Sequence, residues 1–222
     1  MMLCLVTDRR RLGAALGLGP AEWLDALRAQ VFAAAAAGID LVQVREPDLE
    51  AADLTRLMRS LLADNRHTAT RLLVNDRLDV ALATGAAGVH LKDRSFATAA
   101  ARAVAPVGFL VGRSVHDAST AVSAGIADYL VAGTVLPTVS KPLGVCLGWN
   151  GLADVVKAAG NRPVLAIGGI DLPSIPLVAA SCAAGLAAIG AFVPTAGQGL
   201  SEFVQKQVKD MRLAFDSAQS VS

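Results

Sequence analysis

The chain has 222 residues, of which 54% are hydrophobic and only 4% aromatic, and its net charge is +1. A core built mainly from Ala, Val, Leu and Ile is typical of helices packed on buried parallel strands. A near-neutral charge without long runs of one sign argues against a nucleic-acid partner or an electrostatically held membrane partner. The composition therefore favours an α/β protein that acts on a small molecule.

Apolar runs of strand length alternate with helical patterns along the whole chain. The first strand is expected at 3–7, followed by a loop over 8–20 and a helix over 22–37. The remaining strands are expected at 39–45, 72–75, 88–91, 108–112, 129–132, 164–167 and 186–189. The remaining helices are expected at 50–64, 78–84, 96–104, 116–124, 150–159, 172–184 and 201–218. The pattern predicts eight strand–helix units.

A weak internal repeat supports this count. The phrases AAAGIDLVQV, ATGAAGVHL, SAGIADYLV and CAAGLAAIG each place a glycine between a helix end and a strand. We expect Gly38, Gly85, Gly125 and Gly185 to end helices, because glycine adopts the left-handed conformation easily. Consecutive right-handed crossovers close most simply as a barrel. The prediction is one (β/α)₈ TIM barrel domain over residues 1–222, with an open doubly wound sheet as the alternative.

Two segments resemble targeting signals. Arg9, Arg10 and Arg11 precede LGAALGLG as in a twin-arginine signal, but the apolar part is short, broken by glycine and followed by Pro20. The uncharged run 172–201 exceeds the ~20 residues of a membrane span, but prolines and glycines divide it into helix, turn and strand. The cysteines show no metal or redox spacing. We therefore expect a cytoplasmic protein with no membrane and no nucleic-acid partner.

Polar residues and glycines gather where the predicted strands end, which is where a TIM barrel carries its chemistry. These residues are Gln43, Arg45, Asn75, Asp76, Ser114, His116, Thr138, Ser140, Lys141, Gly168, Gly169 and Gly190. Exposed backbone N–H groups at Gly168, at Gly169 and at the turn after Gly190 are suited to hold a phosphate. The alternative is that these glycines only permit tight turns.

Six phrases occur in order along nearly the whole chain: LVTDR, LVQVRE, LLVNDRLDVALATGAAGVHL, VGRSVHD, DYLVAGTVLPTVSKPLG and VLAIGGI. In these phrases the chain resembles the thiamine-phosphate synthase family. The resemblance implies a (β/α)₈ barrel and one of two activities. The synthase joins a pyrimidine diphosphate to a thiazole phosphate with Mg²⁺ and releases pyrophosphate. The thiazole tautomerase branch moves a proton on a thiazole carboxylate phosphate.

Several positions match the family. Gln43 and Arg45 fit its Q-x-R phrase, in which the planar guanidinium would meet phosphate or carboxylate oxygens. Asn75 and Asp76 fit its Asn-Asp pair, and the resemblance implies that the aspartate helps to hold Mg²⁺. The hydroxyls and ammonium of the loop after the sixth strand fit the binding of a monophosphate. These residues are Thr138, Ser140 and Lys141.

Two positions depart from the synthase pattern. Pro47 stands where the synthase has a lysine for the diphosphate, and Ser95 stands where it has a second metal carboxylate, with Asp93 two positions early. A pyrophosphate leaving group needs metal or cationic charge in the transition state, so these losses argue against the synthase. The phrase GRSVH resembles the tautomerase branch, in which the histidine matching His116 carries the proton.

The leading hypothesis is therefore a thiazole tautomerase-like isomerase of thiamine biosynthesis that needs no cofactor. It would act on a small phosphorylated thiazole, with His116 as the catalytic residue. Ser114 and the last-strand glycines would contribute to binding. Two alternatives stay open. One is a thiamine-phosphate synthase, a transferase that uses Mg²⁺ on Asp76. The other is a non-catalytic, phosphate-ligand-binding regulatory barrel. Ala-rich helix faces are compatible with a homodimer.

Overall fold

The computed structural model describes residues 1–138, 145–195 and 197–219. The strands are β1 (Met2–Val6), β2 (Leu41–Val44), β3 (Arg71–Asn75), β4 (Gly88–Leu91), β5 (Leu110–Val115), β6 (Tyr129–Gly133), β7 (Val164–Ile167) and β8 (Gly185–Ala188). The α-helices are α1 (Arg9–Leu16), α2 (Trp23–Ala36), α3 (Ala51–Asp64), α4 (Leu78–Thr84), α5 (Thr98–Val104), α6 (Ala118–Ser123), α7 (Gly148–Ala159), α8 (Ile175–Ala180) and α9 (Leu200–Gln219). Short 3₁₀ helices are η1 (Pro20–Glu22), η2 (Leu172–Ser174) and η3 (Gly190–Phe192).

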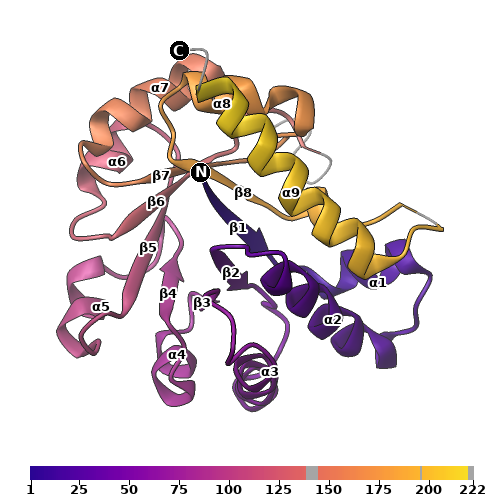
Figure 1. The fold of residues 1–222 in the computed structure, drawn as a ribbon. Coiled ribbons are helices and arrows are strands. Elements are labelled where there is room, and N and C mark those ends of the chain that lie inside the picture. Colours follow the sequence, from indigo (N-terminus) through magenta and orange to yellow (C-terminus); the bar gives the residue numbers. More distant parts are fainter. Residues whose placement is uncertain (139–144, 196, 220–222) are drawn as a thin grey trace.

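The strands form a closed parallel barrel in the order β1 to β8, with the helices arranged around it (Figure 1). The barrel closes because β8 pairs with β1 in parallel, with Leu3 opposite Leu186. This closure confirms the predicted (β/α)₈ TIM barrel and excludes the open sheet. All strands run the same way, so their C-terminal ends meet at one face. We call that face the mouth.

Two layers of apolar side chains hold the barrel together. The larger layer lies between the barrel wall and the helices. The smaller one fills the barrel interior and is made of Cys4, Val6, Leu41, Leu73, Tyr129, Val131, Leu165 and Ala187. Because strand side chains alternate between the two faces, Leu41 and Gln43 both point into the barrel. Gln43 lies one layer nearer the mouth than Leu41.

Three sequence predictions of local structure are wrong. The segment 8–20, predicted as a loop, contains α1; its helical pattern is weak because Arg9–Arg11 precede only two buried positions, Leu12 and Gly13. Strand β5 extends to Val115 rather than ending at 112. Gly112 is an interior residue of β5, where a Cβ would lie 2.3 Å from the ring of Tyr129. The predicted strand was therefore ended at a glycine that in fact makes room for Tyr129 in mid-strand.

The third difference is at the end of α8. Gly185 is not a helix cap but the first residue of β8, and a Cβ there would lie 1.8 Å from the carbonyl oxygen of Met2. Close approach of β1 therefore requires this glycine. The left-handed conformation is adopted instead by Cys182, whose φ is 59°.

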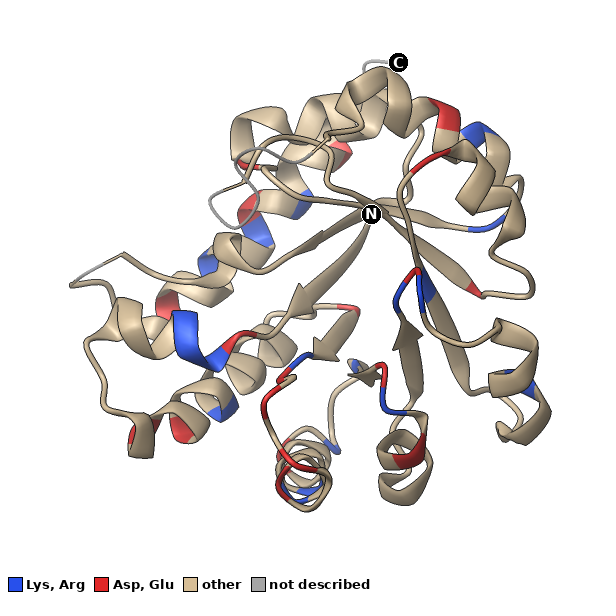
Figure 2. Cartoon of the chain, turned by 180° about the vertical axis from the view of Figure 1, so that it is seen from behind, with Lys and Arg blue, Asp and Glu red and all other residues tan. Residues whose placement is uncertain are grey.

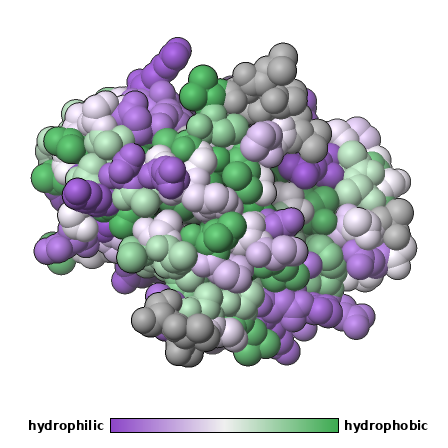
Figure 3. Space-filling model, turned by 90° about the horizontal axis from the view of Figure 1, so that it is seen from above, coloured by the Kyte–Doolittle hydropathy of each residue, from purple (hydrophilic) through white to green (hydrophobic). Residues whose placement is uncertain are grey.

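The face seen from above Figure 1 is mixed in character. Figure 3, which views the molecule from the top of Figure 1, shows hydrophobic and hydrophilic side chains interspersed over that face. Among the helices that the structure describes, none combines the length and the hydropathy needed to cross a membrane. The uncharged run 172–201 is divided instead among η2, α8, β8 and η3.

Candidate active site

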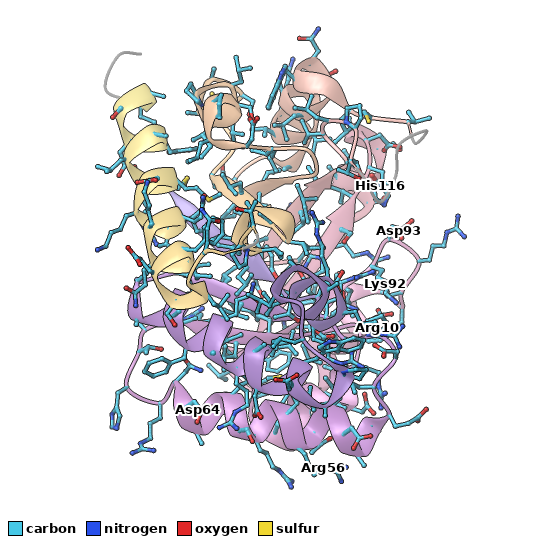
Figure 4. All side chains as sticks on the ribbon, turned by 90° about the vertical axis from the view of Figure 1, so that its right-hand side faces the viewer. Arg10, Arg56, Asp64, Lys92, Asp93 and His116 are labelled. Carbon is cyan, nitrogen blue, oxygen red and sulfur yellow. The ribbon has the colours of Figure 1, made fainter. Side chains whose placement is uncertain are left out.

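The mouth brings charged residues from several loops to one side of the barrel. Figure 4 shows Arg10, Lys92, Asp93 and His116 along one edge of the molecule, with Asp64 toward the opposite side. Figure 2 shows Lys and Arg next to Asp and Glu on loops that follow the strands. The four residues along this edge each follow a strand: Arg10 follows β1, Lys92 and Asp93 follow β4, and His116 follows β5. TIM-barrel sites use this arrangement.

A hollow of about 310 Å³ lies elsewhere, on the outer surface between α2 and α3. It is lined by Asp25, Arg28, Ala29, Phe32 and Asp64. Arg28 bridges α2 and α3 there, with 3.0 Å between its Nη2 and Oδ2 of Asp64. Its charged lining is paired within the surface, and it lies away from the strand ends. We therefore place the candidate site at the mouth.

A layer of hydrogen-bonded polar side chains lies beneath the mouth, inside the barrel. Nε2 of Gln43 donates to Oδ1 of Asn75 at 2.8 Å. The ring of His90 lies 2.9 Å from Oγ of Ser114 through Nε2 and 3.1 Å from the hydroxyl of Tyr129 through Nδ1. Burial lowers the pKa of His90 to about 4, so the ring is neutral near pH 7. These residues, three of them predicted to bind substrate, form the floor of the site.

Asp76 is the acidic residue at the end of β3, and its carboxylate is already engaged. Nζ of Lys92, which directly follows β4, lies 2.8 Å from one carboxylate oxygen. The hydroxyl of Ser95 donates to the other oxygen, and the backbone N–H of Lys92 donates to that hydroxyl at 3.0 Å. Burial opposes ionisation of Asp76, but the bonds from Lys92 and Ser95 outweigh it and lower its pKa. Asp76 is therefore an ionised carboxylate held by a cation.

Arg113 of β5 holds the loop that carries Lys92 and Ser95. Its guanidinium donates to the carbonyl oxygens of Asp93 at 2.6 Å, Phe96 at 2.7 Å and Ser95 at 3.2 Å. Three bonds from one planar group fix the loop against β5. Arg113 therefore acts as a clamp on the loop after β4.

A buried carboxylate joins the loops after β1 and β2. Glu46 accepts from the hydroxyl of Thr7 at 2.7 Å and from Nη1 of Arg9 at 2.8 Å. Burial raises the pKa of Glu46, while the arginine and hydroxyl oppose that effect. Nη2 of Arg9 also reaches Asp48 at 2.5 Å, and this hydrogen bond holds the pKa of Asp48 well below its usual range.

The same hydroxyl fixes the backbone of Arg45. Oγ1 of Thr7 accepts from the N–H of Arg45 at 2.9 Å while it donates to Glu46. By strand alternation from Leu41 and Gln43, Arg45 belongs to the barrel-facing side. The network thus sets the direction in which the predicted phosphate-binding arginine leaves β2.

His116 follows β5 and lies at the rim of the mouth. Its Nδ1 donates to the carbonyl oxygen of Gly133 at the end of β6, and its Nε2 lies 3.7 Å from Oδ2 of Asp93. Its side chain is 44% exposed. His116 therefore connects the ends of β5 and β6 and faces solvent on its other side.

Glycines dominate the ends of the last strands. Gly169 has φ 69°, and a Cβ there would lie 2.6 Å from Cβ of Leu136 in the loop after β6. A Cβ on Gly168 would lie 2.5 Å from Cγ2 of Thr134. The loop after β6 thus packs directly on the backbone of these glycines, and side chains cannot occupy the space.

Gly190, after β8, has a cationic neighbour. A Cβ on Gly190 would lie 2.5 Å from Nη2 of Arg11, so the guanidinium of α1 rests on this glycine. Arg11 was not predicted as a site residue, because residues 8–20 show no clear helical pattern and were predicted as a loop. Of the predicted loop residues, Thr138 is half-buried. Ser140 and Lys141 lie outside the described residues.

Comparison with known proteins identifies the family. A family model described as thiamine monophosphate synthase (TMP-TENI) matches residues 18–192. The chain belongs to this family. It is 42% identical over 163 residues to the thiamine-phosphate synthase of Methanoregula boonei, covering 72% of this chain and 75% of that one. It is 36% identical over 180 residues to the thiamine-phosphate synthase of Methanoculleus marisnigri, covering 80% and 83%.

A solved structure agrees with these relatives. The chain is similar to the thiamine phosphate pyrophosphorylase of Pyrococcus furiosus, with TM-score 0.79 and 28% identity, covering 98% of this chain and 96% of that one. The relatives are named for the synthase. The leading hypothesis of a tautomerase-like isomerase is therefore wrong, and the findings support the transferase alternative.

The structure gives a physical reason for this error. Each residue of the phrase GRSVH that carried the hypothesis has a structural contact in the barrel. Gly112 packs on Tyr129, Arg113 clamps the preceding loop, Ser114 contacts His90, and His116 bonds a backbone carbonyl. The phrase is therefore a feature of how β5 fits the barrel and does not discriminate between the two reactions.

Proposed function

We propose that the protein is a thiamine-phosphate synthase: it joins a pyrimidine diphosphate to a thiazole phosphate and releases pyrophosphate. The observation that carries the proposal is the similarity to proteins of that name over more than 70% of the chain. Cationic residues at the mouth support it. Arg45 and Lys92 follow β2 and β4, the two strands that flank β3 and Asp76.

The two phosphorylated substrates would bind at different parts of the mouth. Arg45 would meet the diphosphate with its planar fork. The backbone around Gly168 and Gly169, with Arg11 beside Gly190, would hold the thiazole phosphate. During reaction the bond between the pyrimidine substrate and its diphosphate breaks, and its electron pair leaves with pyrophosphate. The pyrimidine then forms its new bond to the thiazole. His116 would position the loop after β6 through the carbonyl of Gly133.

The described donors do not fit Mg²⁺ as they stand, although the synthase reading implies it. A magnesium ion in a phosphate site usually takes one or two carboxylates in addition to phosphate oxygens and water. Asp76 offers one carboxylate, and Lys92 and Ser95 occupy its oxygens. The part of the chain that the structure describes contains no group of three or more His, Cys, Asp or Glu that could hold a metal. We therefore route no step through the metal.

The test is synthesis of thiamine phosphate from the two purified substrates, with pyrophosphate release followed in parallel. Turnover should require both substrates and should stop when either is omitted. Tight binding of both substrates without turnover would contradict the proposal and favour the regulatory barrel. The homodimer and the cytoplasmic location expected from the sequence stay predictions; gel filtration and cell fractionation test them.

A further inference from the structure

Lys92 occupies a position at the mouth that the family resemblance does not assign. It directly follows β4, and its Nζ lies 2.8 Å from Asp76 with half of the side chain exposed. Ser95, three residues later, donates to the second oxygen of the same carboxylate. One lysine and one hydroxyl thus surround the carboxylate that the synthase reading gives to a metal.

We propose that Lys92 is a diphosphate-binding residue that supplies from within the chain part of the positive charge that Mg²⁺ would otherwise bring. The inference rests on the proposed function for the identity of the ligand. The contact with Asp76 alone does not require it, since surface ion pairs are common. Three further features of the loop support it.

The first feature is the rigidity of the lysine's position. Arg113 fixes the loop after β4 with bonds to the carbonyls of Asp93, Ser95 and Phe96. The backbone N–H of Lys92 is itself bonded to the hydroxyl of Ser95 at 3.0 Å. A preorganised cation loses less conformational freedom on binding than a free surface lysine does.

The second feature is spare hydrogen-bonding capacity. An ammonium group has three donors, and the ion pair with Asp76 uses one side of it. Half of the Lys92 side chain is exposed, so its other side is accessible to a ligand. A diphosphate bound there would bridge Lys92 and Arg45 across the end of β3.

The third feature is charge balance between neighbours. Pro47 removes the cation that a synthase would carry after Arg45, and Ser95 removes an acidic residue beside Asp76. Lys92 replaces the positive charge that is missing at Pro47. Ser95 in place of a carboxylate removes a negative charge that would repel a diphosphate. Both residues therefore make the site more favourable for a diphosphate.

The test is calorimetric titration of inorganic pyrophosphate into the full chain with EDTA and, separately, with Mg²⁺. Lys92→Met should raise the Kd in EDTA at least about tenfold, the loss expected for a charged hydrogen bond. Lys92→Arg should restore most of the affinity. Arg94→Met is the matched control, since it removes a charge from the same loop at a side chain that is 95% exposed. It should change the Kd less than about twofold.

The response to Mg²⁺ gives a second readout. Without Lys92 the carboxylate of Asp76 is released, so Mg²⁺ should improve pyrophosphate binding more in Lys92→Met than in the wild type. Unchanged binding by Lys92→Met in EDTA, or no pyrophosphate binding by the wild type, would overturn the inference. The synthase assay distinguishes the two proposals. If the wild type forms thiamine phosphate and Lys92→Met binds pyrophosphate normally, only the proposed role of Lys92 is wrong. If pyrophosphate binding depends on Lys92 but the wild type shows no turnover, only the proposed synthase function is wrong.

Discussion

The two halves of the mouth are built on different principles. Around β1 to β5, charged side chains make the contacts: Arg113 clamps the backbone of a loop, Lys92 pairs with Asp76, and Arg9 pairs with Glu46. Around β6 to β8, the described residues put glycine backbone at the strand ends, and the loop after β6 packs on glycines such as Gly169. The first half suits a ligand with several negative charges and the second a small monophosphate held by N–H groups.

The difference shows how each half tolerates change. A side-chain network loses affinity stepwise, because each charged contact contributes separately, although neighbours are coupled. A backbone surface loses affinity when its shape changes, because a single added methyl group displaces the loop packed on it. Four substitutions test this contrast.

The largest effect is expected at Gly169. Gly169→Ala combines a left-handed φ, about 1–2 kcal/mol, with a collision against Leu136, about 1–3 kcal/mol more. Unfolding in urea should show the loss, and binding of thiazole phosphate should weaken with it. Gly17→Ala is the matched control, since Gly17 has φ 68° but no atom within 4 Å of the added Cβ. It should show the strain alone; equal losses in both variants would contradict the packing account.

The floor of the charged half should respond to pH through His90. Its pKa is lowered by burial from 6.5 to about 4, so the unfolded chain binds the proton more readily. Stability from the neutral ring is complete above pH 6.5 and is lost as the pH falls toward 4. The full loss is about 3 kcal/mol, since each pKa unit corresponds to about 1.4 kcal/mol.

Urea unfolding of the wild type and His90→Gln between pH 7 and pH 4 measures this effect as a difference. The comparison cancels the opposite contribution of Glu46, whose raised pKa stabilises the fold as the pH falls. Parallel curves for the two proteins would show that folding does not lower the pKa of His90.

Arg45 tests whether the charged half recognises geometry as well as charge. Arg45→Lys keeps the charge but loses the planar fork, so kcat/KM for the pyrimidine diphosphate should fall roughly ten- to a hundredfold. Steady-state kinetics measure it. Arg94→Lys in the exposed loop should leave kcat/KM within about twofold. A normal rate for Arg45→Lys would mean that only charge matters at this strand end.

The smallest effect is expected at Arg11, the cation that lies against Gly190 in the glycine half. Arg11→Met should raise KM for the thiazole phosphate about five- to tenfold with little change in kcat, as expected for loss of a charged contact. Arg10→Met is the control, since its guanidinium bonds Asp48 at 2.6 Å. A larger effect at Arg10 than at Arg11 would contradict the contact with Gly190.

The barrel was predictable because its signals are local and repeated. Apolar runs such as 88–91 and 164–167 give strands with the predicted bounds, and glycines mark many of the turns. Helix α1 was not predictable in the same way. Its stability comes from tertiary contacts: Arg9 reaches Glu46 and Asp48, and Gly13 lies under Trp23. Those partners are remote in sequence or lie beyond an irregular turn, so no periodic pattern in the sequence indicates the helix.

The site shows the same division. Alternation along one strand predicted Gln43 and Arg45 on a common face, and Gln43 lies inside the barrel, bonded to Asn75. The pairing of Lys92 with Asp76 joins two strand ends 16 positions apart, and nothing local indicates it. The choice of reaction was wrong because GRSVH was interpreted as chemistry, whereas its residues contact the barrel. A motif that fits the fold closely carries little information about the reaction.

Glu46 links the two halves, and this has a consequence for how the sequence can change. Through Thr7 it sets the backbone of Arg45, and through Arg9 it anchors α1, the helix that carries Arg11. A substitution at this one carboxylate should therefore disturb both the backbone of Arg45 and the position of α1, the two places where the proposed function puts the two substrates. Under the proposed function, a change at Glu46 would therefore alter the specificities for the two substrates together rather than separately.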